Sequence, residues 1–152
     1  MQKIIPNLWF NGNAKEAVDF YLSVFSGCKI NATTHYPKEG RADFQRDLAG
    51  QILSMVFEML GERFVAINAG PEFTFNESVS FAITCKDQAE IDYYWDALTK
   101  DGGQESVCGW LKDKHGLSWQ VAPEGIDEWV QNPKSFARMM EMKKIIIEDL
   151  RP

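Results

Sequence analysis

Apolar and polar positions along the chain follow the same order twice. An apolar run at 4–10 is followed by a polar turn and then by apolar residues at three-to-four-residue spacing, which predicts a strand and then a helix over about 14–25. A second apolar run at 79–85 gives way to the same helical spacing, which predicts a strand and then a helix over 87–100. The chain therefore begins two equivalent halves.

The start of each predicted helix carries the same motif. Asn13 and Asp87 are each followed by a glutamate three residues on, the spacing of a capping box, and by an aromatic pair that begins seven residues on. The two caps lie 74 residues apart (87 − 13), a period too long for a solenoid repeat. We therefore expect a tandem duplication in which both helices begin in the same way and bury an aromatic face.

Strands follow each helix, and helices end the chain. Further strands are predicted at 28–36, 51–60 and 63–68 in the first half and at 107–112 and 117–121 in the second. The polar stretch 37–50 is a long loop without a counterpart in the second half, and such loops are often functional lids. Two helices are predicted at 125–130 and 133–150, with Pro133 in the first turn of the latter.

These patterns predict one α+β structural domain built from three segments. They are a first module at 1–70, a second module at 71–124 and a helical C-terminal extension at 125–152. Phe136, Met139 and Met140 fall at helical spacing in the extension, which favours packing in the core. The same residues also fit a cover for a dimer partner or for the mouth of a cavity.

Composition narrows the function classes. The 152 residues are 45% hydrophobic and 25% charged, which is typical of a globular protein. The net charge of −6 repels polyanions, so a nucleic-acid partner is not expected. No apolar stretch approaches the length of a membrane span. Three widely separated cysteines do not form a disulfide framework or a zinc motif, and a reducing cytoplasm fits best.

Particular runs of sequence resemble a known family. The paired strand–helix–meander halves and the hairpin at 113–120 (DKHGLSWQ) resemble the vicinal-oxygen-chelate superfamily of glyoxalase I, bleomycin-resistance proteins and extradiol dioxygenases. The runs at 6–14 (PNLWFNGNA) and 108–113 (CGWLKD) resemble its PhnB-like family, many of whose members are labelled demethylubiquinone methyltransferase. The resemblance covers about residues 3–123. It implies two βαβββ modules that form an incomplete barrel around a cavity, commonly completed in a homodimer.

The resemblance also implies where a divalent metal would be held. Glyoxalase-type members use His, Gln and Glu side chains from the first and last strands of each module. The corresponding positions here are Pro6, Ser80 and Gln120, and either Val65, Ala66 or Asn68. A catalytic metal needs about three imidazole, carboxylate or thiolate ligands. We therefore expect neither a metal nor another cofactor.

Aromatic and polar residues of the predicted strands are candidates for the cavity wall. Pockets for small organic ligands combine apolar walls with a few placed polar groups. The substrate-binding candidates are Trp9, Asn11, Phe57, Asn68, Ser80, Trp110 and Gln120. Trp119 and Gln120 point to opposite faces of their strand, so they do not both line a cavity. The aromatic residues of this set fit a closed core equally well.

Two functions remain open. The first is a homodimeric, metal-independent protein that binds a small organic ligand. The second is an enzyme acting on a small aromatic or carbonyl substrate, a lyase, dioxygenase or methyltransferase, that is metal-independent or holds a metal across the dimer. Its catalytic candidates are Glu58, whose proton affinity rises if it is buried, and His35, near a strand end beside the long loop. A homodimer is expected because open sheet edges are normally paired or covered.

Overall fold

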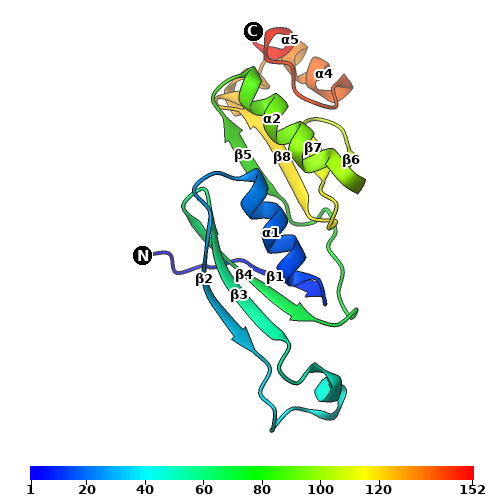
Figure 1. Ribbon diagram of the computed structural model, residues 1–152. Helices are drawn as coiled ribbons and strands as arrows, with labels where there is room; N and C mark the ends of the chain where they lie inside the picture. Colours follow the sequence, from blue (N-terminus) through cyan, green and yellow to red (C-terminus); the bar gives the residue numbers. More distant parts are fainter. The chain divides into compact units, whose positions relative to one another are not determined.

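Each half of the chain forms its own unit in the computed structural model, which describes residues 1–152 (Figure 1). The first unit is Met1–Thr74 and the second is Phe75–Pro152. The first contains β1 (Asn7–Asn11), α1 (Ala14–Val24), β2 (Lys29–His35), the 3₁₀ helix η1 (Asp43–Leu48), β3 (Ile52–Met59) and β4 (Glu62–Ala69).

The second unit repeats this order and adds the C-terminal helices. It contains β5 (Phe81–Cys85), α2 (Gln88–Thr99), the 3₁₀ turn η2 (Lys100–Gly102), β6 (Gln104–Glu105), β7 (Trp110–Lys112) and β8 (Ser118–Pro123). It ends with α3 (Ile126–Trp129), α4 (Pro133–Glu141) and α5 (Ile147–Leu150). The sequence pattern did not predict β6, because its two residues are too few to show an alternation. None of the helices has the length and hydrophobicity that a membrane crossing requires.

The two sheets have the same topology. Their strand orders are β1-β4-β3-β2 and β5-β8-β7-β6, and in each the first strand lies parallel to the last. The remaining neighbours are antiparallel. Each unit is therefore a βαβββ module with an open four-stranded sheet, and the prediction of an α+β fold made of two such modules is confirmed.

One face of each sheet is covered by the helix of its own module. In the first unit α1 packs on β3 and β4 through Ala17, Tyr21 and Val24, which are buried. In the second unit α2 packs on β7 and β8. Its buried residues are Ile91, Tyr94, Trp95 and Leu98. The predicted apolar stripes of the two helices are therefore the faces that pack on the sheets and form each core. The other face of each sheet is not covered by the helix of its module.

The two helices do not begin in the same way, although the motif predicted that they would. Asp87 accepts a hydrogen bond from the Glu90 amide (2.9 Å), as expected for an N-cap. Asn13 has φ −117° and ψ 26°, which is not the extended conformation of a cap, and its side chain makes no cap hydrogen bond. Asn68 on β4 replaces it, because its Oδ1 accepts from the Ala14 amide (3.1 Å).

The C-terminal extension is broken where one helix was predicted over 133–150. The chain leaves the helix at Met142, and the carbonyls of Met142 and Lys143 accept from the amides of Cys108 and Gly109 (both 2.8 Å). The Ile145 side chain that follows is fully buried. Gly109 has φ +82°, and a Cβ there would lie 3.0 Å from Ile145 Cγ1. Pairing with the 108–109 segment therefore overrides the helical pattern.

Core packing was the favoured of three alternatives for the apolar face of α4, and the structure does not place that face in the core. Phe136 and Met140 are exposed, Met139 is half-buried, and Ser135 is the buried residue of this helix. The core is filled instead by Ile145 and Leu150 beyond the break.

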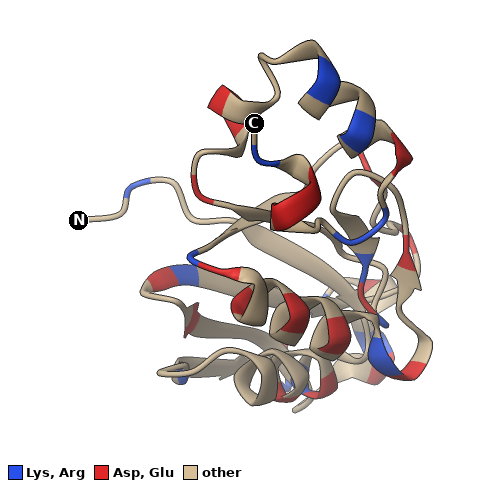
Figure 2. Ribbon diagram, turned by 90° about the horizontal axis from the view of Figure 1, so that it is seen from above, with Lys and Arg blue, Asp and Glu red and all other residues tan.

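Charged residues are interspersed over the ribbon, with the acidic ones more frequent (Figure 2), as 22 acidic and 16 basic residues require.

Candidate functional site

A hollow of about 140 Å³ lies in the second unit beside the β7–β8 hairpin. Its wall includes Trp110, Leu111 and Lys112 on β7 and Ser118 on β8, and Lys112 and Ser118 are paired across the two strands. The rest of the wall comes from the connector before β5, from β6 and from the residue that follows β6: Glu77, Gln104, Glu105 and Ser106.

Ser118 is the most informative residue of this hollow. The residue is 1% exposed, and its Oγ has no hydrogen-bond partner. A buried hydroxyl without a partner costs about 1–3 kcal/mol, and a native structure rarely carries that cost without a reason. A polar ligand atom in the hollow would supply the missing hydrogen bond.

Asp113 fixes the hairpin that presents Ser118 to the hollow. It is 2% exposed, and its Oδ1 accepts from the backbone amides of His115 (2.8 Å) and Leu117 (3.2 Å). Its Oδ2 accepts from Trp119 Nε1 (2.8 Å). These bonds hold the turn and the strand that follows it, so Lys112 and Ser118 face each other in register. Trp119 accordingly packs on the helix side, opposite to Gln120.

Lys112 is the cation of the hollow. Its Nζ lies 2.5 Å from Glu77 Oε1, and the hydrogen bond lowers the pKa of Glu77 below its ordinary value. Glu105, which also lines the hollow, accepts from Trp95 Nε1 (2.7 Å). Lys112 therefore pairs with one carboxylate, that of Glu77, and the Glu77 side chain is 61% exposed.

Three of the predicted binding residues lie together beside this hollow. Trp110 pairs with Gln120 in the β7–β8 register, and Gln120 Nε2 donates to Ser80 Oγ (2.9 Å). Gln120 also pairs with Ala82 on β5. The side chains of Trp110, Gln120 and Ser80 thus form a half-buried strip on the sheet face that α2 does not cover.

The first unit places the other candidates on both faces of its sheet. Trp9 lies on the face away from α1, where its Nε1 donates to the Gly70 carbonyl (2.9 Å) and its ring contacts Phe73 edge-on. Glu58 is on the same face and pairs with Lys29 Nζ (3.3 Å). His35 is exposed at the end of β2.

Phe57 and Asn68 lie on the face that α1 covers. Phe57 is fully buried and stacks with Tyr21 at 6.3 Å between ring centroids. Asn68 is 8% exposed, and its Nδ2 donates to the Ile52 carbonyl (3.0 Å) while its Oδ1 caps α1. Asn11 is exposed at the end of β1. These three residues belong to the first unit, whereas the hollow is formed by residues of the second.

The side chains at the superfamily's metal positions do not suit a metal. Val65 pairs with Asn7 on β1, and Gln120 pairs with Ala82 on β5, so each lies on a last strand beside the first strand of its module. Pro6 and Ser80 directly precede β1 and β5. These positions offer one amide and one hydroxyl, already bonded to each other, where a metal needs imidazole or carboxylate donors. No cluster of three His, Cys, Asp or Glu residues in the chain has the arrangement of a metal site.

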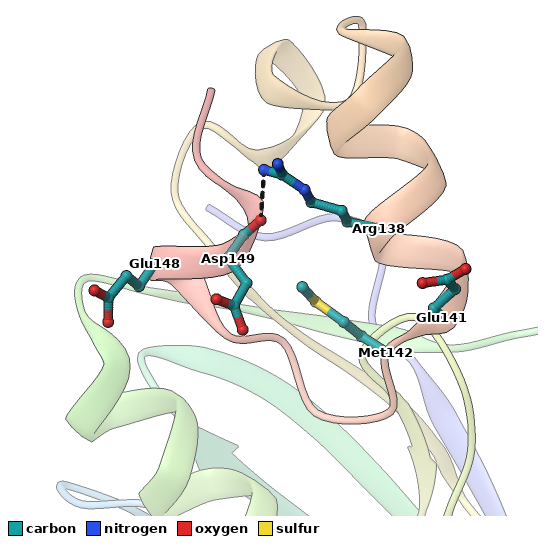
Figure 3. Close-up of a pocket in the computed structure, with 5 residues that line it drawn as sticks. All are labelled: Arg138, Glu141, Met142, Glu148 and Asp149. Atoms are coloured by element: carbon teal, nitrogen blue, oxygen red, sulfur yellow. Dashed lines mark hydrogen bonds between the residues drawn. The ribbon is translucent and has the colours of Figure 1, made fainter.

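A larger and more open hollow, of about 490 Å³, lies in the C-terminal extension (Figure 3). Figure 3 shows Arg138 reaching from α4 toward the segment that carries Asp149, and its Nη1 donates to the Asp149 carbonyl (3.0 Å). Glu141, Met142 and Glu148 complete the wall. The carboxylates here belong to exposed residues, so this hollow lacks the buried polar group that distinguishes the one beside Ser118.

Sequence reasoning missed Lys112 and Ser118 as site residues. A signal for Ser118 was present, because strand alternation places it on the same face as the candidate Gln120. Nothing in the sequence indicated that its hydroxyl would be buried without a partner. That condition depends on the connector and on β6, whose positions follow from the tertiary structure.

Comparison with known proteins agrees with this topology. Residues 2–122 match the sequence profile of the family described as 3-demethylubiquinone-9 3-methyltransferase. A PhnB protein from Bacillus cereus, described as a candidate 3-demethylubiquinone-9 3-methyltransferase, is 30% identical, with a TM-score of 0.68 over 80% of this chain and 99% of that one. No curated protein matches the chain.

More distant structures share the fold. Protein PA1353 from Pseudomonas aeruginosa is 22% identical, with a TM-score of 0.64 over 82% of this chain and 98% of that one. The fosfomycin resistance protein FosX from Mesorhizobium loti is 13% identical, with a TM-score of 0.56 over 87% of this chain and all of that one (100%). The profile match and the 30% identical PhnB protein, together with the duplicated βαβββ topology, show that this protein belongs to the PhnB-like family, described as 3-demethylubiquinone-9 3-methyltransferase.

Proposed function

We propose that this protein binds a small organic ligand at the hollow beside the β7–β8 hairpin. The observation that carries the proposal is the buried Ser118 hydroxyl, which lines the hollow and has no partner. Trp110 supplies an aromatic wall and Lys112 a cation, which is the usual composition of a small-molecule pocket. Binding a ligand needs no metal at this place.

Native mass spectrometry of the freshly purified protein tests the proposal. We expect a co-purified small molecule, or a thermal stabilisation by members of a small-aromatic library, because a ligand that binds only the folded state raises its stability. Trp110→Ala removes the aromatic wall and should abolish both signals. Trp129→Ala, which changes a tryptophan outside the hollow, is the matched control. A protein that carries no ligand and responds to no library member contradicts the proposal.

We further propose that the protein works as a homodimer. All seven residues of the edge strand β2 are exposed, including Ile30 at 39%. A long exposed edge strand is normally paired or covered in a native protein. The exposed Phe136 and Met140 of α4 add apolar surface that a second copy would cover. A two-fold dimer is the commonest way to do so.

A reducing cytoplasm is the proposed compartment. Cys28, Cys85 and Cys108 are all free thiols, and Cys85 is fully buried. Free thiols persist most readily where cellular reductants prevent disulfide formation. Fractionation of cells that express the tagged protein tests this placement, and recovery from an oxidising compartment would contradict it.

Ligand binding is better supported than catalysis by Glu58 and His35. Glu58 pairs with Lys29 at one end of β2, and His35 lies at the other end, six residues along an extended strand. That spacing separates them by roughly 20 Å, which is too far for an acid and a base to act on one bond. The description of the family names methyl transfer. No side-chain arrangement described above favours that reaction over ligand binding.

A further inference from the structure

We propose that the hollow beside Ser118 binds the carboxylate of a small aromatic acid, which replaces Glu77 on Lys112. This inference rests on the proposed binding function and adds the chemical class of the ligand. Three features support it: the donors Lys112 and Ser118, the carboxylate of Glu77 that already pairs with Lys112, and the aromatic wall.

The two donors lie at paired positions of neighbouring strands. Lys112 and Ser118 are directly opposite each other on adjacent antiparallel strands, and both line the hollow. Side chains in such a pair have Cβ atoms about 4.5–5.5 Å apart. A carboxylate has two oxygens, so one can accept from Lys112 Nζ and the other from the Ser118 hydroxyl. A neutral ligand group would make a weaker bond to the ammonium than a charged acceptor does.

Glu77 already shows that this place accepts a carboxylate. Its Oε1 lies 2.5 Å from Lys112 Nζ, but Ser118 Oγ remains without a partner. Glu77 stands on the connector before β5, and its side chain is 61% exposed, so it can move into water without breaking the sheet. A ligand carboxylate that takes its place leaves the local charge unchanged and gains the bond to Ser118. Glu105, the other carboxylate of the wall, accepts from Trp95 Nε1 through Oε1, and the ion pair of Lys112 is with Glu77.

Trp110 provides the wall for the rest of the ligand. It lies two residues before Lys112 on β7 and on the same face, about 6–7 Å along the strand. An aromatic ring attached to the bound carboxylate therefore reaches the indole. The hollow of about 140 Å³ suits one ring, since an apolar cavity of about 150 Å³ is large enough for benzene.

Fluorine NMR of matched acids and amides tests this inference on the full-length protein. The probes are 4-fluorobenzoate and 4-fluorophenylacetate, each compared with its carboxamide. We expect at least one acid to bind at least tenfold more tightly than its amide. Lys112→Met should remove that preference, and Ser118→Ala should weaken the acid about threefold to tenfold. Glu77→Gln removes the resident carboxylate and should tighten binding of the acid severalfold.

The control variants are Lys100→Met, Ser23→Ala and Glu72→Gln, which change the same residue types away from the hollow and should leave binding of the acid unchanged. If acid and amide bind equally in the wild type, the hollow remains a binding site but the carboxylate inference is wrong. The inference is also wrong if Glu77→Gln weakens binding or if Lys112→Met keeps the preference. If no probe binds to the wild type or to Glu77→Gln, both the inference and the proposed function at this hollow are overturned.

Discussion

At the scale of single residues, buried polar groups decide how each module is held together. Asn68 joins three parts of the first unit. Its side-chain Oδ1 caps α1 by accepting from the Ala14 amide, and its Nδ2 donates to the Ile52 carbonyl. Its backbone carbonyl accepts from Tyr36 Oη (2.9 Å). Asp113 has the same role in the hairpin of the second module. Both are polar residues in the core, and each has its hydrogen bonds satisfied.

Replacing Asn68 by alanine should therefore destabilise the protein. We expect Asn68→Ala to lower the free energy of unfolding by about 1–3 kcal/mol, because the Ala14 amide and the Ile52 carbonyl lose a buried partner. Urea denaturation measures the change. Asn31→Ala, at an exposed position of β2, is the control and should stay within about 0.5 kcal/mol of the wild type. A loss of the same size in both variants would show that the cap does not matter.

The pH dependence of stability in alkali should report on Cys85. Burial raises the pKa of its thiol from an ordinary 9.0 to about 12. Between these values the unfolded chain has lost a proton that the folded chain retains, so the free energy of unfolding should fall as the pH rises from about 9 toward 12. Below pH 9 Cys85 should have no effect on the pH dependence.

Denaturant unfolding at several pH values measures this fall. Cys85→Ala should flatten the decline relative to the wild type. Parallel declines for the wild type and Cys85→Ala would contradict the assignment.

At the scale of elements, local patterns predicted what depends on local sequence. Helix α1 and helix α2 were predicted to within about a residue because their apolar stripes and stop signals lie inside the segments themselves, although the cap of α1 comes from Asn68 on β4. The break at Met142 was not predictable, since 142–146 contains neither glycine nor proline. It depends on hydrogen bonds to Cys108 and Gly109, which are more than thirty residues earlier.

The candidate site shows the same division between local and tertiary information. Trp110, Gln120 and Ser80 were among the seven predicted candidates because their strands could be recognised, and the structure places these three together. Phe57 and Asn68 were placed in that group because the sequence of 51–68 does not reveal which of its two faces meets the helix. The Glu77–Lys112 pair depends on a connector without a periodic pattern, so sequence gave no sign of it.

One side chain should control the attachment of the C-terminal extension. Gln88 on α2 donates through Nε2 to the Ile145 carbonyl (3.0 Å) and accepts through Oε1 from the Ile147 amide (2.8 Å). Gln88→Ala removes both bonds, each worth about 1 kcal/mol. Backbone amides of 143–151 should then exchange with deuterium about tenfold faster or more, as measured by mass spectrometry.

Gln131→Ala serves as the control for that experiment, because Gln131 bonds only to a carbonyl of its own turn. It should leave exchange in 143–151 unchanged. Lys144 pairs with Asp92 at 2.8 Å and remains in both variants, although Gln88→Ala also removes the hydrogen bond from Gln88 Nε2 to the same Asp92 oxygen (3.1 Å). Equal exchange in Gln88→Ala and the wild type would mean that burial of Ile145 and Leu150 alone holds the extension.

At the scale of the whole molecule, the proposed homodimer accounts for surfaces that a single chain leaves open. Sedimentation equilibrium should show a dimer at concentrations down to the low micromolar range. Ile30→Lys, which adds a charge to the exposed strand β2, should raise the dissociation constant at least tenfold, whereas Val79→Lys at an exposed connector position should not. A wild-type protein that stays monomeric at tens of micromolar would rule out the dimer.

The most direct test of the central claim is a ¹H–¹⁵N NMR titration that follows the indole of Trp110. The protein has five tryptophans, and Trp110→Phe assigns the relevant signal by its loss. On addition of a small aromatic ligand, we expect the Trp110 indole and the amides of Lys112 and Ser118 to shift together and to saturate, while the indole of Trp129, which does not line the hollow, stays in place. Shifts confined to other residues, or no saturable shift at these three, would contradict a ligand site beside the β7–β8 hairpin.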